Sequence, residues 1–371
     1  MTAAAKSYFR YHLRSKWKLL LCIIVIALVL TAWNSPNQKY EGAHYDYKTG
    51  AVIDNYVEYY CTLGTSLAVL VVCSCILPVT EFSIFKKRRN LDCFYGLPIS
   101  RRQMGIVHYL SGLVCLVVPY TCAFLANFLF LLRYPGGYDF GALIWYYFLS
   151  LWLGICAYSV NVFLFNRANT TWDGICFMIL WQFAISAIIG TCNSVSMSIY
   201  EAIVSDGEYS YEIWTQKWKI PGSEMASPLA ALSEVEWIYT DRIEKDEGAA
   251  VLAFWGSLPH IGGLLFQSGI GIASVLGFVF SFGKGRTEKT EEVSDSWFGF
   301  KLMIPLYATL LTISSFGVGM ILTLIATFIA YIIYRKGFHL KLSDWLVLAA
   351  LFHLNLFMLF IDLLIFSAIK G

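Results

Sequence analysis

Residues 81–103 read Glu81-Phe-Ser-Ile-Phe-Lys-Lys-Arg-Arg-Asn-Leu-Asp-Cys-Phe-Tyr-Gly-Leu-Pro-Ile-Ser-Arg-Arg-Gln103, a polar interruption between two long apolar segments. Six of its side chains are basic and two are acidic. Short loops with such a basic excess stay on the cytoplasmic side of a membrane. The stretch therefore predicts a membrane protein in which this loop faces the cytosol.

The same loop predicts local structure. Asn90 to Tyr95 form an amphipathic turn with its apolar side chains on one face, and Gly96 and Pro98 then end the helix. Ser100 and Gln103 have the spacing of a capping box that begins the next helix. A short, capped helix with aromatic residues at its tip is suited to binding a partner in the cytosol.

The composition supports a membrane protein. Of the 371 residues, 58% are apolar and 14% are charged, and the mean hydropathy is +0.61. A soluble protein of this length carries roughly 25% charged residues. Nearly all of the ten cysteines fall in apolar stretches, where they act as small packing residues, and no metal-binding residues are predicted.

The apolar pattern predicts an all-α polytopic membrane protein with about nine transmembrane helices. Residues 1–17 form an amphipathic interfacial helix, because apolar and basic side chains follow separate helical stripes. Nine segments then approach the ~20 residues that a bilayer requires; they lie near 18–34, 58–80, 104–132, 142–165, 174–193, 260–282, 300–316, 318–334 and 344–367.

These spans predict a domain order. Residues 18–282 form a six-span core, 283–299 a cytoplasmic connector, and 300–371 further C-terminal membrane helices. The sizeable polar segment at 194–258 holds eleven acidic and four basic residues, and is predicted to lie outside. Within it, Ser227 followed by a proline begins a helix.

The orientation follows from the basic residues. With the N-terminus inside, nineteen of the 27 Lys and Arg residues fall on cytoplasmic segments and eight fall outside. The reverse orientation would invert this bias, against the positive-inside rule.

Motifs for common enzyme chemistry are missing from the sequence. It has no G-x-x-x-x-G-K-[ST] loop, no H-E-x-x-H pair and no G-x-S-x-G elbow. We therefore expect no catalytic residues and no ATP hydrolysis by this chain alone.

A few polar residues at membrane depth are candidate sites. Asp362 and His353 in the last span form a possible intramembrane ionisable site. Gln182, Ser186 and Asn193 in the fifth span are candidates for a substrate path, and hydrogen bonding between helices is the alternative.

Three stretches resemble the permease subunits of bacterial ATP-binding-cassette exporters of the type-2 family. They are the basic N-terminal helix, the loop containing Tyr95-Gly-Leu-Pro-Ile-Ser-Arg-Arg102, and the charged connector Gly285-Arg-Thr-Glu-Lys-Thr-Glu-Glu292. The loop is similar to the family's "D-x-x-Y-S-L-P-I-S-R" segment, and the connector to its "R-K-S-E-x-A-G-E" segment. The family core has six spans, whereas this chain is predicted to carry three more.

The resemblance implies that this chain forms the transport path and that separate subunits hydrolyse ATP. The first cytoplasmic loop would contain the coupling helix that docks on the ATPase, here Asn90, Leu91, Asp92, Cys93, Phe94 and Tyr95. ATP and magnesium would be bound by separate ATPase subunits, so this chain needs no cofactor. A second permease, identical or different, would complete the transporter in the bacterial plasma membrane, and no nucleic acid is involved.

Two other functions fit the same composition. The acidic, tryptophan-containing external segment suits a module that senses or resists antimicrobial peptides. A secondary transporter would need inverted repeats, broken helices or several buried charges near the midplane, and none is convincing here.

The topology is directly testable with cysteine substitutions at Ser100 and Ser210 in intact cells. We expect an impermeant thiol reagent to label position 210 and to spare position 100, because only the former is predicted to face outward. Labelling at position 100 without labelling at position 210 would refute the orientation.

Overall fold

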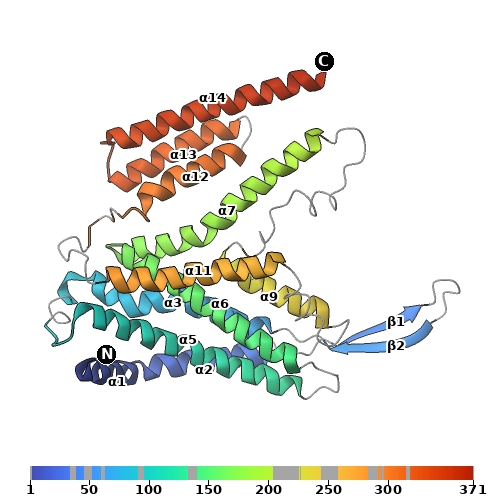
Figure 1. Ribbon diagram of the computed structural model, residues 1–371, viewed down its shortest axis with the longest axis vertical. Coiled ribbons are helices and arrows are strands. Elements are labelled where there is room, and N and C mark those ends of the chain that lie inside the picture. Colours follow the sequence, from blue (N-terminus) through green and yellow to red (C-terminus); the bar gives the residue numbers. More distant parts are fainter. Residues whose placement is uncertain are drawn as a thin grey trace. The chain divides into compact units, whose positions relative to one another are not determined.

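The computed structural model describes residues 2–33, 39–45, 52–59, 63–90, 96–132, 140–203, 225, 227–243, 258–282, 291–292, 294, 296–314 and 318–370. The chain forms two compact units, each built from two separate stretches of sequence. Unit 1 contains residues 1–163 and 228–286, and unit 2 contains residues 164–227 and 287–371. Figure 1 colours the chain from its N-terminus to its C-terminus.

Each predicted span overlaps a helix, although the helix at predicted span 58–80 begins only at Gly64 and the helix at 174–193 continues to Ile203. These helices are α2 (Trp17–Trp33), α3 (Gly64–Phe82), α5 (Arg101–Leu131), α6 (Phe140–Arg167), α7 (Thr171–Ile203), α11 (Leu258–Ser281), α12 (Phe300–Ser314), α13 (Val318–Arg335) and α14 (Leu342–Lys370). Five of them, α3, α5, α6, α7 and α11, are long and apolar enough to cross a membrane. The bent pair of α1 (Ala3–Ser15) and α2 provides a sixth candidate span, and the apolar parts of α12, α13 and α14 are shorter. The protein is therefore a helical membrane protein, and the count of nine spans remains a prediction.

Helix α1 is a separate N-terminal helix that bends by 50° into α2. The Thr2 hydroxyl caps its start by accepting a hydrogen bond from the amide of Ala5 at 3.3 Å. Ala5 and His12 are buried, whereas Trp17 at the start of α2 is 53% exposed. The face of α1 that packs on the protein is thus the one that carries His12, and the basic side chains of Lys6, Arg10 and Arg14 are exposed.

A two-stranded hairpin adds to the helical fold predicted from the sequence. Strand β1 (Lys39–Tyr45) pairs antiparallel with β2 (Val52–Tyr59), starting from Lys39 opposite Tyr59. The register shifts between His44 and Tyr45. Tyrosine, valine and isoleucine favour extended structure, and this short segment lacks the continuous apolar length of a span.

A proline inside α3 determines how that helix packs on α6. Pro78 has no amide hydrogen, so the carbonyl of Ser74 loses its helical donor. The fully buried Asn161 of α6 supplies the missing donor, with its Nδ2 atom 3.0 Å from the Ser74 oxygen. Close approach of the same two helices depends on Gly154, because a Cβ atom there would overlap the Leu70 side chain.

Helices α5 and α6 are joined by pairs of buried hydroxyl groups. The hydroxyls of Tyr109 and Ser159 lie 2.8 Å apart, and those of Tyr120 and Ser150 lie 2.6 Å apart. Such bonds satisfy polar groups that would otherwise be buried in an apolar environment, and they fix the register of the two helices.

Unit 2 contains α12, α13 and α14 side by side, as Figure 1 shows. Arg335 at the end of α13 forms two 2.8 Å hydrogen bonds to the carboxylate of Asp344 in the first turn of α14. Asp344 also accepts a hydrogen bond of 3.0 Å from the amide of Lys341. Arg335, one of the basic residues counted on the cytoplasmic side, therefore also fixes the turn between two helices.

The segment between α7 and α11 is described only in part. Helix α9 (Pro228–Ile243) begins at the proline that follows Ser227, as the sequence predicts. Residues 194–203 of the predicted segment 194–258 belong to α7, and residues 204–224, 226 and 244–257 lie outside the described residues.

The bond between Asn161 and Ser74 is testable with a double-mutant cycle. Asn161→Leu should lower the free energy of unfolding by about 1–3 kcal/mol, because it leaves a buried carbonyl without a donor. In a Pro78→Ala background the loss should be much smaller, since residue 78 then donates its own amide hydrogen. Reversible unfolding in mixed detergent micelles measures both values, and equal losses in the two backgrounds would contradict this explanation.

Candidate functional site

A buried polar cluster lies where α1, α3 and α5 meet in unit 1. Its centre is Glu81, at the end of α3, whose side chain is 0% exposed. The Nε2 atom of His12 lies 2.8 Å from Glu81 Oε2, and the Nδ1 atom of His108 lies 3.2 Å from the same oxygen. Lys16 places its Nζ atom 3.7 Å from Glu81 Oε1. One carboxylate therefore contacts two imidazoles and an ammonium group.

The acceptor chemistry of the carboxylate assigns the hydrogens in this cluster. An ionised carboxylate only accepts hydrogen bonds, so both histidines donate to Glu81 through the nitrogens that face it. The other ring nitrogen of His108, Nε2, lies 3.1 Å from the Tyr8 hydroxyl, which then donates to it. Glu81 Oε2, the two imidazoles and the Tyr8 hydroxyl therefore each have a partner of the right type.

Aromatic side chains cover the cluster on the side of α5. The ring centroids of Phe85 and Phe82 lie 4.9 Å and 6.1 Å from that of His108. Phe278 and Phe282 at the end of α11 pack on Phe82, at 5.4 Å and 6.0 Å. This apolar cover keeps water from the polar contacts, and electrostatic attraction is stronger where the dielectric is low.

The cluster and the contacts beside it attach both ends of the basic loop to helix α1. The η1 turn (Ser83–Lys86) begins two residues after Glu81. At the other end, the Ser100 hydroxyl accepts a 3.3 Å hydrogen bond from the amide of Gln103, which is the N-cap half of the predicted capping box. The Gln103 side chain accepts a 3.2 Å hydrogen bond from the Thr2 hydroxyl of the N-terminal helix. Helix α1 is thus bound to the start of α5 as well as to the end of α3.

Most of the predicted coupling helix falls outside the described residues. Asn90 ends a short helical turn, and its amide donates to the carbonyl of Lys87 at 3.1 Å. Leu91, Asp92, Cys93, Phe94 and Tyr95 are not described.

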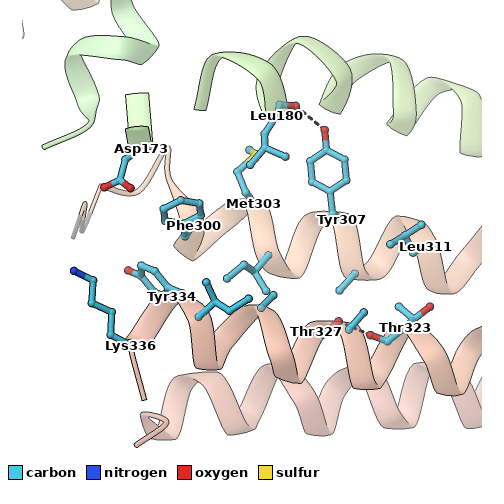
Figure 2. Close-up of a pocket in the computed structure, with 15 residues that line it drawn as sticks. Asp173, Leu180, Phe300, Met303, Tyr307, Leu311, Thr323, Thr327, Tyr334 and Lys336 are labelled. Atoms are coloured by element: carbon cyan, nitrogen blue, oxygen red, sulfur yellow. Dashed lines mark hydrogen bonds between the residues drawn. The ribbon is translucent and has the colours of Figure 1, made fainter. Parts of the chain in front are cut away.

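Unit 2 contains a largely apolar pocket of about 490 Å³. Figure 2 shows its lining, which comes from α7, α12 and α13. Asp173 and Lys336 lie at one end, and Thr323 and Thr327 lie toward the other. The two threonine hydroxyls donate to helix carbonyls, at 2.9 Å and 2.7 Å, so the body of the pocket offers mainly apolar contact.

The residues predicted to line a substrate path do not line this pocket. Gln182 is buried, whereas Ser186 and Asn193 are partly exposed. The lining residues that α7 contributes to the pocket are Asp173 and Leu180.

The predicted ionisable site in the last span is described only in part. His353 is exposed, and its Nδ1 atom lies 2.7 Å from the carbonyl oxygen of Ala349 in the same helix. The side chain of Asp362 lies outside the described residues. A shared ionisable site of His353 and Asp362 therefore stays a prediction.

The cluster around Glu81 was not predicted from the sequence. Glu81 was assigned to the polar loop, and His12 and His108 were not singled out at all. A signal was present, because an acid at the end of one apolar helix and a histidine near the start of the next are both costly to bury alone. The sequence alone does not show that α1 packs against Glu81 and His108.

The role of Glu81 is testable by its conservative substitution. Glu81→Gln should raise the amide hydrogen exchange of residues 3–15, because removing one partner of a buried charged group costs about 3–5 kcal/mol. Glu292→Gln, the same change at an exposed acid, is the matched control and should leave the exchange of α1 unchanged. Equal protection of α1 in wild type and Glu81→Gln would show that the cluster does not hold the helix.

Comparison with known proteins assigns no family to this chain. No protein-family model matches the sequence. No curated protein matches it either. The resemblance to exporter permeases therefore depends on the residues quoted above, and the function that follows is a proposal.

Proposed function

We propose that the chain is the transmembrane permease subunit of an ATP-binding-cassette exporter, working in the bacterial plasma membrane with its N-terminus in the cytosol. The five or six candidate spans and the basic loop between α3 and α5 support this function. The resemblance of that loop to the family's coupling segment gives the class of transporter.

The observation that carries the proposal is the attachment of the loop at both ends. Glu81 fixes the end of α3 to α1, and the Ser100 cap with Gln103 fixes the start of α5 to the same helix. A force applied to residues 87–99 would therefore act on α1, α3 and α5 together. A permease needs this rigidity, because ATPase motion must reach the spans without being absorbed by a loose loop.

The ATPase motion would come from a separate subunit. The sequence lacks a nucleotide-binding loop, so ATP and magnesium would be bound by the partner and this chain would not be an enzyme. Two permeases, identical or different, would pair around a path, and two ATPases would close on ATP and push the loops. The complex would then alternate between inward-facing and outward-facing states.

The pocket in unit 2 supports an amphiphilic or peptide-like cargo. Its volume of about 490 Å³ is within the ~300–1,000 Å³ typical of small-molecule sites. The lining is apolar along most of its length, with Asp173 and Lys336 at one end. A molecule with an apolar body and a polar or charged end matches that distribution.

Assembly gives the first test of this function. The protein, extracted from its native membrane in mild detergent, should have the native mass of two permeases with two ATPase subunits that carry a nucleotide-binding loop. A stable chain that transports without any ATPase would refute the proposal.

The coupling residues give a sharper test within that complex. Phe94→Ala or Tyr95→Ala should reduce transport-linked ATPase activity strongly, because truncating an aromatic anchor at an interface costs about 2–4 kcal/mol. Lys87→Ala, a matched change of an exposed basic residue in the same loop, should have a smaller effect of about 1 kcal/mol. Unchanged ATPase stimulation in Phe94→Ala at matched expression would remove residues 90–95 from the coupling role.

A further inference from the structure

We propose that His12, Glu81 and His108 form a binding site for one divalent transition-metal ion of the zinc class. The inference does not rest on the proposed transport function, because the site is made by three side chains of this chain alone. Its ligands come from α1, α3 and α5, so a bound ion would join the N-terminal helix to two membrane helices.

The geometry brings three ligand atoms to one point. His12 Nε2, His108 Nδ1 and Glu81 Oε2 all lie within 4.8 Å of one another. The carboxylate oxygen is 2.8 Å from the first nitrogen and 3.2 Å from the second. Ligand atoms around a tetrahedral zinc ion lie about 3.3 Å apart, because zinc bonds to nitrogen and oxygen are ~2.0–2.2 Å long. Metal binding would require the two imidazole nitrogens and the carboxylate oxygen to move to about this separation.

The ligand types select the class of metal. Two imidazoles and one carboxylate suit zinc and its neighbours in the first transition row, whereas magnesium and calcium prefer oxygen ligands alone. Three protein ligands leave a fourth tetrahedral position for water.

The surroundings supply the outer contacts that such sites use. A metal-bound histidine commonly donates its other N–H group to a neighbouring oxygen, which fixes the ring. The Tyr8 hydroxyl, 3.1 Å from His108 Nε2, is placed to accept that hydrogen. The second oxygen of Glu81 accepts no hydrogen bond from the residues that the structure describes, and Lys16 lies 3.7 Å from it.

Metal binding would replace the hydrogen bonds to Glu81 and would change the tautomer of both histidines. Each histidine binds a metal as a neutral ring through an unprotonated nitrogen. The proton on His12 Nε2 therefore moves to Nδ1, and the proton on His108 Nδ1 moves to Nε2. The alternative state is the cluster of hydrogen bonds around Glu81 with Lys16 beside it, and the experiment distinguishes the two.

The site also has an entry side. The side chains of Glu81 and His108 are 0% exposed, whereas that of His12 is 11% exposed. An ion would therefore enter past His12 of α1, and the Phe82 and Phe85 side chains cover His108.

A zinc titration of the purified full-length protein tests the site. After chelator treatment, the protein should take up one Zn²⁺ per chain in competition with a fluorescent zinc chelator, and Mg²⁺ should not compete. His12→Gln and His108→Gln should each weaken that binding by about 10-fold or more, the scale known for disturbed metal sites. The control His353→Gln alters an exposed histidine on α14 and should leave the binding unchanged.

A second variant keeps the test valid if the glutamine variants fold poorly. His12→Cys retains a metal ligand, and with Co²⁺ it should add a thiolate-to-cobalt charge-transfer band to the wild-type spectrum. Failure of the wild type to bind zinc would overturn the site. Zinc binding that is insensitive to His12→Gln and His108→Gln, or the absence of the added band, would equally show that the cluster is held by hydrogen bonds only. Each of these readouts is independent of ATPase partners, so the proposed function would be unaffected.

Discussion

The burial of the Glu81 carboxylate is the constraint on which unit 1 depends. A carboxylate with no exposure is unfavourable unless it is paired, and no partner is available within α3 itself. Its partners, His12 and Lys16, come from the N-terminal helix and the bend that follows, and His108 comes from α5. Satisfying one charge thus requires three helices to meet, and that meeting point positions the basic loop.

Polar groups buried in apolar helices organise the rest of the molecule in the same way. Pro78 exposes the carbonyl of Ser74, and Asn161 of a neighbouring helix satisfies it. In unit 2, Arg335 and Asp344 meet in a bidentate pair at the turn between α13 and α14. Apolar side chains alone would leave such helices free to slide, because lipid is as apolar as they are. The few polar contacts therefore specify which helices are neighbours.

Local signals in the sequence were enough to place the helices. Apolar length located the spans, and the Ser100 cap and the proline at the start of α9 were read from single residues. The contacts of Glu81 were beyond such reasoning, because His12 and His108 are 69 and 27 residues away from it in sequence. The hairpin of β1 and β2 was also missed, since a search for apolar length does not register an alternating, tyrosine-rich segment. Long-range pairing is thus the part of the fold that a single sequence does not specify.

We expect α1, α3 and α5 to move as one rigid body centred on Glu81. The most direct measurement is the distance between spin labels at Arg10→Cys on α1 and Arg101→Cys at the start of α5, both exposed positions, by double electron–electron resonance. We expect one narrow distance distribution in a chain whose ten native cysteines are replaced by serine, broadened when Glu81→Gln is added. A broad distribution before that change, or a narrow one that survives it, would contradict the claim that the buried carboxylate fastens the three helices together.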